Sequence, residues 1–422
     1  MRIWLVTIGE PVPVHKNARD RLFRTAYFAH FLADHGHDVT WWTSTFDHYR
    51  KRNLFENDTT LSINRRLQIN LLHSCGYKSN VSFSRMRDHW QVAKKFSRLI
   101  RDSEIHPDVI ISSLPTIELC LESVKFGKQS GIPVVLDTRD MWPDIFVDCA
   151  PKLLQPIARI LLSPLFKNAA LACSEATAIL GITDAFVEWG IKRGQRQRTD
   201  LDRSFPMGYT TVLPPREEIR NAEKFWEGYG IPTHKHAFVA CFFGALARSL
   251  DIKTIILAAR KLKESNKPIY FVICGDGDFF QYYRHMASGL PNIVFPGRVD
   301  AVAIHTLMRH ADIGLDPLID RYDFLATINN KAIEYMSAGL PIISSPAHGV
   351  LFDLLAKEQC GLSYDCGDAD GLVNILLKLW NDRVLVRNMA ERSRQVFHEK
   401  FTAEKVYNEM MKHLEEIVKS VQ

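Results

Sequence analysis

Short apolar runs alternate with longer stretches of helical spacing along most of the chain. The first run, Ile3-Trp-Leu-Val-Thr-Ile8, predicts a strand, and the proline-containing segment 9–13 after it predicts a loop. A helical pattern from about residue 19 to residue 35 ends at Gly36, and residues 38–43 have the pattern of the next strand. This order predicts a right-handed βαβ unit with two parallel strands.

The alternation continues through the first half of the sequence. Residues 108–112 and 133–137 have the pattern of strands, and residues 117–130 that of the helix between them. Two further short runs, at 171–174 and 210–213, predict the last strands of this series.

A second series follows residues 214–236, which contain adjacent prolines and many charges and which we expect to be a linker with a short helix. Its expected strands are 238–243, 269–274, 293–295, 313–315 and 342–344, and residues 369–421 have a helical pattern. Two such series predict an α/β protein in which two doubly wound, Rossmann-like domains face a cleft. We expect domains over 1–213 and 237–389.

Composition agrees with a globular protein of two domains. The 422 residues exceed what one hydrophobic core usually organises, and 46% hydrophobic with 24% charged residues excludes disordered, collagen-like and coiled-coil chains. No apolar run approaches the roughly 18 residues of a membrane span, and residues 3–8 are too short for a signal-peptide core. None of the eight cysteines forms a C-x-x-C pair, so we expect buried thiols, no metal site and a cytoplasmic location.

The basic excess of the chain is concentrated between residues 50 and 101. Twelve lysines and arginines lie there against three acidic residues, within a formal net charge of +5 for the whole chain. Such a patch attracts phosphate in anionic lipid, in a lipid diphosphate or in nucleic acid. An ordinary solvated helix face is the alternative, and the sequence leaves both open.

The most informative loop of the second series lies at residues 327–341. Asn329 or Asn330 can cap a short helix, and Lys331 then lies in its first turn, where the helix dipole disfavours a cation by roughly 0.3–1 kcal/mol. A bound anion reverses that preference, since free N–H groups and the lysine converge on it. Glu334, one turn later, is placed to accept hydrogen bonds from sugar hydroxyls. A surface lysine and an ordinary helix glutamate are the equally supported alternative.

Glycine-containing loops follow other strands of the second series. Gly244 permits close approach of a ligand, and Arg248 offers a fork of donors suited to a diphosphate. Gly275 and the main chain of Arg298 are expected on the same rim, while the adjacent Asp276-x-Asp278 favours a tight turn over a metal site.

In the first series, residues 137–144 combine three acids, an arginine and a tryptophan at a strand end. This composition favours recognition of a polyol by hydrogen bonding and stacking, and we assign Asp140 to the catalytic set with Arg248 and Lys331. The absence of G-x-G-x-x-G, P-loop and Gly-x-Ser-x-Gly motifs disfavours dehydrogenase, ATPase and hydrolase functions.

Taken together, the motifs resemble those of the bacterial retaining glycosyltransferases of family 4, which have the GT-B fold. The N-terminal part of the resemblance rests on Gly9-Glu-Pro, Arg21-x-x-Arg24-Thr and Gly36-His-Asp-Val-Thr-Trp-Trp-Thr-Ser-Thr-Phe-Asp-His48. The C-terminal part rests on Gly244-x-x-x-Arg248, Gly275-Asp-Gly277, Asn330-Lys-x-x-Glu-Tyr-Met-x-Ala-Gly-Leu-Pro341 and Cys360-Gly-Leu. The chain looks most similar to the branch that transfers acetamido sugars in O-antigen and capsule synthesis.

The resemblance implies a role for each part of the chain. A nucleotide-sugar donor, UDP- or GDP-linked, would bind the second domain, with Arg248 and Lys331 on the diphosphate, Glu334 on the ribose, and Gly244, Gly275, Arg298 and Asn330 around it. The first domain would hold the acceptor, a glycan or a polyprenyl-diphosphate-linked saccharide, and a final helix over about 390–422 would cross back onto it. Such enzymes need neither a metal nor another cofactor.

The chain departs from the family pattern at two positions. Ala326 stands where the family commonly has a second glutamate, and Leu250 stands where it usually has a lysine, for which Lys253 or Lys331 can compensate. These departures leave the donor sugar open.

The resemblance also sets the expected partners and the alternatives. Peripheral contact with the inner face of the plasma membrane is expected through residues 50–101, with residues 153–166 as an apolar surface candidate or, alternatively, buried core. No nucleic-acid partner is expected, because RNA-binding aromatic and helix-turn-helix signatures are absent. The alternative functions are another GT-B enzyme, such as a nucleotide-sugar 2-epimerase, and a non-enzymatic carbohydrate- or polyanion-binding protein.

Overall fold

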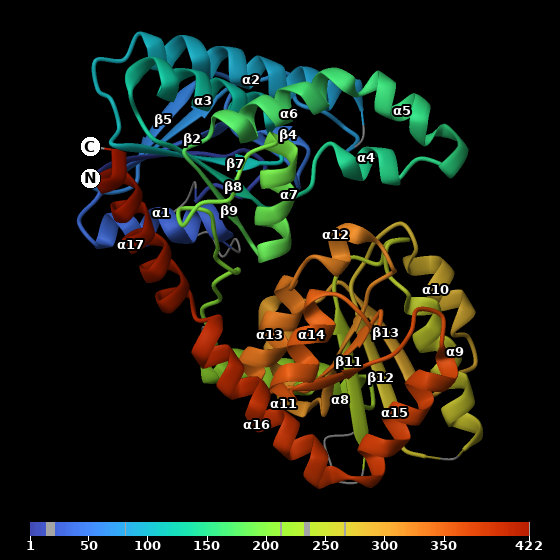
Figure 1. Cartoon of the computed structure of the whole chain (residues 1–422). Coiled ribbons are helices and arrows are strands. Elements are labelled where there is room, and N and C mark those ends of the chain that lie inside the picture. The colour runs from blue at the N-terminus through green and yellow to red at the C-terminus, as the bar shows by residue number, and fades with distance from the viewer. Residues whose placement is uncertain (14–21, 81, 212, 232–236, 266, 422) are drawn as a thin grey trace. The chain divides into compact units, whose positions relative to one another are not determined.

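The computed structural model of the chain describes residues 1–13, 22–80, 82–211, 213–231, 237–265 and 267–421. The chain divides into two compact units. The first unit comprises Met1–Pro206 and Val406–Gln422, and the second comprises Met207–Lys405. In Figure 1, each unit is a central sheet with helices packed on both faces.

The first unit contains an eight-stranded sheet in the order β10-β9-β8-β7-β1-β2-β6-β5, parallel except for the edge strand β5. Its strands are β1 (Arg2–Val6), β2 (Asp38–Ser44), β5 (Thr59–Ser62), β6 (Leu67–Leu72), β7 (Val109–Leu114), β8 (Val134–Thr138), β9 (Ala178–Gly181) and β10 (Arg203–Ser204), and β3 (Phe46–Asp47) pairs separately with β4 (Arg52–Asn53). The strand order reverses direction between β1 and β7, which makes the carboxyl ends of these strands a switch point.

Helices cover both faces of this first sheet. The helices of the unit are α1 (Arg24–Asp34), α2 (Phe83–Arg101), α3 (Ile117–Ser130), α4 (Asp144–Asp148), the 3-10 turn η1 (Lys152–Leu154), α5 (Gln155–Leu161), α6 (Ser163–Glu175), α7 (Asp184–Gly194) and most of α17 (Ala403–Val421). Helix α2 packs on α3, and α3 packs on α6, so these three form one layer, with α1 on the opposite face (Figure 1).

The second unit contains a fully parallel six-stranded sheet in the order β13-β12-β11-β14-β15-β16. The strands are β11 (Phe238–Phe243), β12 (Ile269–Cys274), β13 (Ile293–Gly297), β14 (Ile313–Pro317), β15 (Ile342–Ser345) and β16 (Gly361–Ser363). The helices are α8 (Arg216–Gly228), α9 (Ile252–Glu264), α10 (Phe280–Met286), α11 (Ala301–His310), α12 (Tyr322–Leu325), α13 (Asn330–Ala338), α14 (Val350–Glu358), α15 (Ala369–Asn381) and α16 (Arg383–Lys400).

Both faces of the second sheet are buried, which explains why its strands are continuously apolar. Along β11, Phe238 and Phe242 point into the core under α9 and α15, whereas Val239 and Phe243 point into the core under α11 and α13. The sequence expectation of two doubly wound parallel sheets is therefore confirmed.

Two of the expected strands are wrong. Residues Leu171–Ser174 belong to α6, and the strand that follows is β9. A four-residue apolar run does not distinguish a strand from a turn of buried helix, and this helix begins with proline at its first turn. Among the described residues of 210–213, none is in a strand, and the edge position is taken by β10.

Helices account for the segments before and after the second sheet. Helix α8 lies within residues 214–236 and packs on α11 in the second unit, where the Trp226 indole donates to the carbonyl of Ala303 at 2.9 Å. The helical pattern over 369–421 is confirmed by α15, α16 and α17. The start of the helix expected from residue 19, and Arg21, lie outside the described residues.

An exposed apolar segment follows α4 in the first unit. Leu153 and Ile160 are 92% and 72% exposed, so the surface alternative is right for η1 and α5 and the buried-core alternative is wrong there, although Leu165 in α6 is buried. In the part of the chain that the structure describes, no single helix has the length and apolarity to cross a bilayer, but Lys152–Leu161 and Ser163–Glu175 meet those criteria jointly across a 67° bend.

The cysteines agree only in part with the expectation of buried thiols. Five are buried, namely Cys120, Cys173, Cys241, Cys274 and Cys360, whereas Cys75 and Cys149 are exposed and Cys366 is intermediate.

Candidate functional site

The second sheet has its switch point between β11 and β14, where the strand order changes direction. Ligands of open parallel sheets bind at the carboxyl ends of such strands. Gly244 follows β11 directly, and Asp316 lies near the carboxyl end of β14. Because α13 begins shortly after β14, its first turn belongs to the same edge of the second unit.

Two glycine loops pack backbone against backbone at this edge. A Cβ atom on Gly275 would lie 1.8 Å from the carbonyl oxygen of Gly244, so no other residue fits there without moving the chain. Gly275 has φ +138° and Gly244 has φ +153°, which also favours glycine. The loops after β11 and β12 therefore form a rim whose backbone a ligand can approach closely.

Lys331 lies on this rim beside a buried carboxylate. A Cβ atom on Gly244 would be 3.5 Å from Lys331 Cδ, and Lys331 Nζ is 3.8 Å from Oδ1 of Asp316. The other carboxylate oxygen, Oδ2, accepts a hydrogen bond from Asn329 Nδ2 at 2.5 Å. Burial raises the pKa of Asp316, and Lys331 and Asn329 oppose the rise. Asp316 thus holds the lysine and the start of α13 in place.

The first turn of α13 has the form of an anion site. Of the two expected caps, Asn329 is the one used: its Oδ1 accepts from Ala332 N at 3.0 Å. The first N–H groups of a helix have no partner within it, so those of Asn330 and Lys331 extend the positive end of the dipole toward the rim. A lysine in the first turn interacts unfavourably with the helix dipole. Asp316 offsets this interaction here, and a bound anion would offset it further.

The other residues expected around the nucleotide-sugar donor have fewer contacts that fix their positions. Arg248 and Arg298 are exposed, and within the described residues no hydrogen bond or ion pair is found for either side chain. Glu334 is buried, with 4% of its surface exposed, one turn beyond Lys331.

The two departures from the family pattern are both apolar core positions. Leu250 is buried, and its backbone pairs with that of Leu318. The charge that the family's lysine would supply at this position is therefore absent. Lys331 lies against Gly244, while Lys253 is exposed on α9. Ala326 is buried at the end of α12.

Sequence reasoning missed the role of Asp316. The available signal was an acidic residue at the end of an otherwise apolar strand, Ile313-Gly-Leu-Asp316, because a charge is rarely buried there without a partner.

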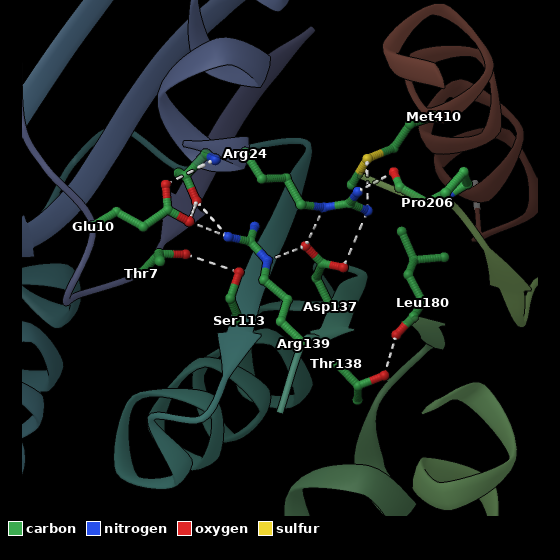
Figure 2. A network of polar contacts seen from close by, with 11 residues as sticks. Thr7, Glu10, Arg24, Ser113, Asp137, Thr138, Arg139, Leu180, Pro206 and Met410 are labelled. Atoms are coloured by element: carbon green, nitrogen blue, oxygen red, sulfur yellow. Dashed lines mark hydrogen bonds and ion pairs between the residues drawn. The ribbon is translucent and has the colours of Figure 1, made fainter. Parts of the chain in front are cut away.

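The first unit contains a buried ion network at the carboxyl ends of β1 and β8. Arg24 Nε is 3.1 Å from Oδ2 of Asp137, both side chains are fully buried, and Arg139 Nε contacts the same oxygen at 2.6 Å (Figure 2). Arg139 also pairs with Glu10, whose carboxylate accepts hydrogen bonds from the backbone and hydroxyl of Thr25. Burial alone would raise the pKa of Asp137, but the two arginines outweigh it and the pKa is lowered.

This network also fastens the C-terminal helix to the first unit. Arg24 donates to the carbonyl of Pro206 at 2.7 Å and contacts the sulfur of Met410 in α17 at 3.6 Å (Figure 2). A second tie joins His413 Nε2 to the carbonyl of Leu201 at 2.9 Å. The signature residues Glu10, Arg24 and Thr25 are therefore structural neighbours, although they are distant from Asp137 in the sequence.

The expectation that residues 137–144 as a whole recognise a polyol is wrong. Asp137 and Arg139 are committed to the buried network, and Asp144 pairs with Arg193 and accepts from the Trp189 indole. Asp140 remains half-buried in the first unit, near enough to Arg85 to influence its pKa.

A second polar cluster, not expected from the sequence, lies at the same edge of the first sheet. The Arg85 guanidinium packs on the Trp142 ring with 4.3 Å from its carbon to the centroid, and its Nε is 3.4 Å from Nε2 of His89. Burial lowers the pKa of His89 to about 3, with Arg85 adding to the effect, so the ring is neutral. His48 Nδ1 lies 2.5 Å from the Tyr77 hydroxyl, which completes an aromatic and basic lining.

The chain is similar in fold, over nearly its whole length, to several solved structures. Sucrose-phosphate synthase from Thermosynechococcus elongatus superposes with a TM-score of 0.71 at 14% identity, over 99% of both chains. Anabaena Alr3699/HepE in complex with UDP gives 0.67 at 14% identity, over 99% of this chain and 100% of that one. The fold is thus that of the GT-B glycosyltransferases, with two Rossmann-like domains.

Part of the chain matches a family of known sequences. Residues 230–396 match the family described as Glycosyl transferases group 1. N-acetyl-alpha-D-glucosaminyl L-malate synthase of Bacillus anthracis is 26% identical over 141 residues, or 33% of this chain and 35% of that protein. Vi polysaccharide biosynthesis protein VipC/TviE of Salmonella typhi is 27% identical over 228 residues, or 50% and 36%. The matches span about a third of the length of these curated relatives.

Proposed function

We propose that the chain is a retaining, metal-independent glycosyltransferase that moves a hexosyl or acetamidohexosyl group from a UDP- or GDP-linked donor. The observation that carries the proposal is the rim of the second unit, where Lys331 and the start of α13 lie beside two loops that approach each other through Gly244 and Gly275. This edge lies within the segment that matches the glycosyltransferase family.

The chemistry follows from the charges on the rim. Cleavage of the bond between the sugar and the diphosphate develops negative charge on the leaving oxygen, and Lys331, Arg248 and the N–H groups of α13 are donors for it. Glu334 is proposed to bind the ribose, and Gly244, Gly275, Asn330 and the Arg298 main chain to surround the nucleotide. With cations neutralising the leaving group, no metal is required at that step. Asp140 is proposed to act from the first unit on the acceptor side.

The acceptor is proposed to be a glycan or a lipid-linked saccharide in cell-surface polysaccharide synthesis, within the cytoplasm. One relative supports this class, since it is named as a Vi polysaccharide biosynthesis protein. The other, named N-acetyl-alpha-D-glucosaminyl L-malate synthase, supports an acetamido sugar as the transferred group. A nucleotide-sugar 2-epimerase remains the alternative of the same fold, and it differs in needing no acceptor.

Nucleotide binding is the direct test of the donor site. We expect UDP or GDP to raise the melting temperature of the full chain, by the equivalent of about 2.7 kcal/mol at a concentration 100 times its dissociation constant. The shift is expected to persist in EDTA, because side chains and helix N–H groups supply the positive charge. Differential scanning fluorimetry with a panel of nucleoside diphosphates measures both. A panel in which no nucleotide shifts the transition would contradict the donor site, and a shift abolished by EDTA would contradict metal independence.

We also propose that the first unit contacts a membrane that contains anionic lipid. Helix α2 has an exposed stripe at helical spacing that joins aromatic and basic side chains, namely Phe83, Arg87, Trp90, Lys94, Arg98 and Arg101. Trp90 and bases at one surface are typical of membrane interfaces. The exposed leucines and isoleucines of η1 and α5 supply apolar area in the same unit, which a bilayer would cover.

Vesicle binding tests this contact. A Leu153→Asp/Ile160→Asp variant is expected to reduce binding to phosphatidylglycerol-containing vesicles by at least about tenfold, since two apolar side chains lose their burial. Val384→Asp, at an exposed aliphatic residue of α16, is the matched control and should bind like the unmodified chain. Co-sedimentation measures the bound fraction. Equal binding of both variants, or equal binding to purely zwitterionic vesicles, would contradict the proposal.

A further inference from the structure

Two cations of the first unit face the same aromatic ring. Lys51 Nζ lies 4.8 Å from the centroid of Tyr77, and Arg85 Cζ lies 5.4 Å from it. Within the described residues, neither cation has a carboxylate oxygen inside 4.0 Å, although Asp140 and Asp88 act on Arg85, and Asp47 acts on Lys51, from farther away. Burial lowers the pKa of Lys51, and the charge of Arg85 lowers it further, so the two positive charges repel each other.

His48 adds a neutral donor to this pair of cations. Burial, together with Lys51 and Arg85, lowers the pKa of His48 to about 4, and burial raises the pKa of Tyr77 to about 12. Both groups are therefore neutral near pH 7, and the Tyr77 hydroxyl lies 2.5 Å from His48 Nδ1, where the tautomer of the ring decides which group donates. Nε2 has no partner among the described residues, and it carries the imidazole proton in the tautomer in which Tyr77 donates.

The hydrogen bonds that position Arg85 and Lys51 occupy only some of their N–H groups. Arg85 Nη1 donates a hydrogen bond to the carbonyl of Asn80 at 2.9 Å, and Arg85 Nε donates to His89. Among the described residues, the Nη2 group of Arg85 makes no hydrogen bond. Lys51 uses one of its three protons on Asn80 Oδ1 at 2.5 Å. Arg85, Lys51 and His48 together thus offer several unused N–H groups, which are the groups that bind phosphate oxygens.

The position of the cluster in the sheet is that of a ligand site. His48 and Lys51 lie in the connection after β2, Tyr77 lies after β6, and Trp142 lies after β8. These are the carboxyl ends of parallel strands of one sheet, where open α/β sheets bind ligands. The half-buried Trp142 ring supports Arg85 and itself packs against Phe146, with 4.4 Å between the ring centroids.

We propose that Lys51, Arg85 and His48 bind a phosphate or diphosphate group of the acceptor. The role of that group as part of the acceptor rests on the proposed function, whereas the anion site itself does not. A phosphate fits because two cations with no carboxylate partner in the described part of the chain, together with a neutral imidazole, match a multiply charged group with several acceptor oxygens. The same group is present in a lipid-linked diphosphate and in a soluble sugar phosphate, so the site selects acceptors by charge.

Titration of inorganic pyrophosphate into the full chain tests the site. The titration is made in an Arg248→Ala background, so that the proposed donor site contributes little. Arg85→Gln and Lys51→Gln are each expected to weaken pyrophosphate binding by about tenfold or more, since each removes a charge-assisted contact. Lys192→Gln, at an exposed lysine of α7 in the same unit, is the matched control, with a change of less than about twofold. Melting curves without ligand confirm that each variant is folded.

The outcomes separate this site from the proposed function. Unchanged pyrophosphate binding in both Lys51→Gln and Arg85→Gln would overturn the site, and so would succinate that binds as tightly as pyrophosphate. If the two variants lose pyrophosphate binding but the unmodified chain binds no nucleotide, the anion site is supported and its role in binding an acceptor is overturned. Titrations with farnesyl diphosphate and glucose 1-phosphate then name the source: the tighter ligand, if it depends on Arg85, identifies a lipid-linked or a soluble acceptor.

Discussion

Replacing Lys331 with methionine is expected to lower donor turnover by about 100- to 1000-fold, the loss typical of removing one donor to a developing negative charge. The methionine keeps the length of the side chain against Gly244 and removes the charge. Asp316, which loses its nearest cation, becomes easier to protonate, because burial already raises its pKa. The second unit should therefore remain folded. Release of nucleotide from a panel of nucleotide sugars measures turnover without knowledge of the acceptor.

Two comparison variants make this result specific. Arg248→Ala should show a loss of the same order, because Arg248 is exposed and unpaired within the described residues and is available to a diphosphate. Lys261→Met removes a surface lysine that pairs with Asp370, and turnover should stay unchanged. Turnover in Lys331→Met that equals the Lys261→Met value would remove Lys331 from the donor site.

The start of α13 was predictable because its signals are local. Asn329, Gly339 and Pro341 lie within one short segment, and capping and helix termination depend on neighbours in sequence. Local signals do not predict that Lys331 lies beside Gly244, since the two residues meet only because β11 and β14 are adjacent in the sheet. That adjacency follows from tertiary structure, as does the contact between Lys331 and Asp316.

The loop 137–144 shows why composition alone misled. Its acids and arginine had the composition of a binding loop, yet Asp137 pairs with Arg24, 113 residues away, and Arg139 pairs with Glu10. Conversely, His48, Tyr77 and Arg85 stand in three separate segments, and no spacing connects them. Arg85 was one of twelve bases in a region whose excess charge was evident, but the sequence does not distinguish a half-buried cation from its solvated neighbours.

Replacing Asp137 with asparagine is expected to destabilise the first unit by about 3–5 kcal/mol, the usual effect of removing one partner from a buried ion pair. The substitution keeps the shape of the side chain but leaves Arg24 buried beside a neutral amide. Arg139 retains Glu10, so most of the loss falls on Arg24 and on its contacts with Pro206 and α17. Hydrogen exchange of the strand amides in the first unit measures the change in opening free energy, with the strands of the second unit as an internal reference.

A surface pair in the same unit supplies the control. Asp184 pairs with Arg198 at 2.9 Å and its side chain is 69% exposed, so Asp184→Asn should cost about 0–1 kcal/mol. The pKa of Asp137 is lowered in the folded chain, so its contribution is present above the unfolded value of about 3.9 and is lost as the pH falls through the folded value. Asp137→Asn should therefore also weaken the acid dependence of stability. Equal, small losses in the two variants would mean that the buried network contributes no more to the first unit than an exposed salt bridge does.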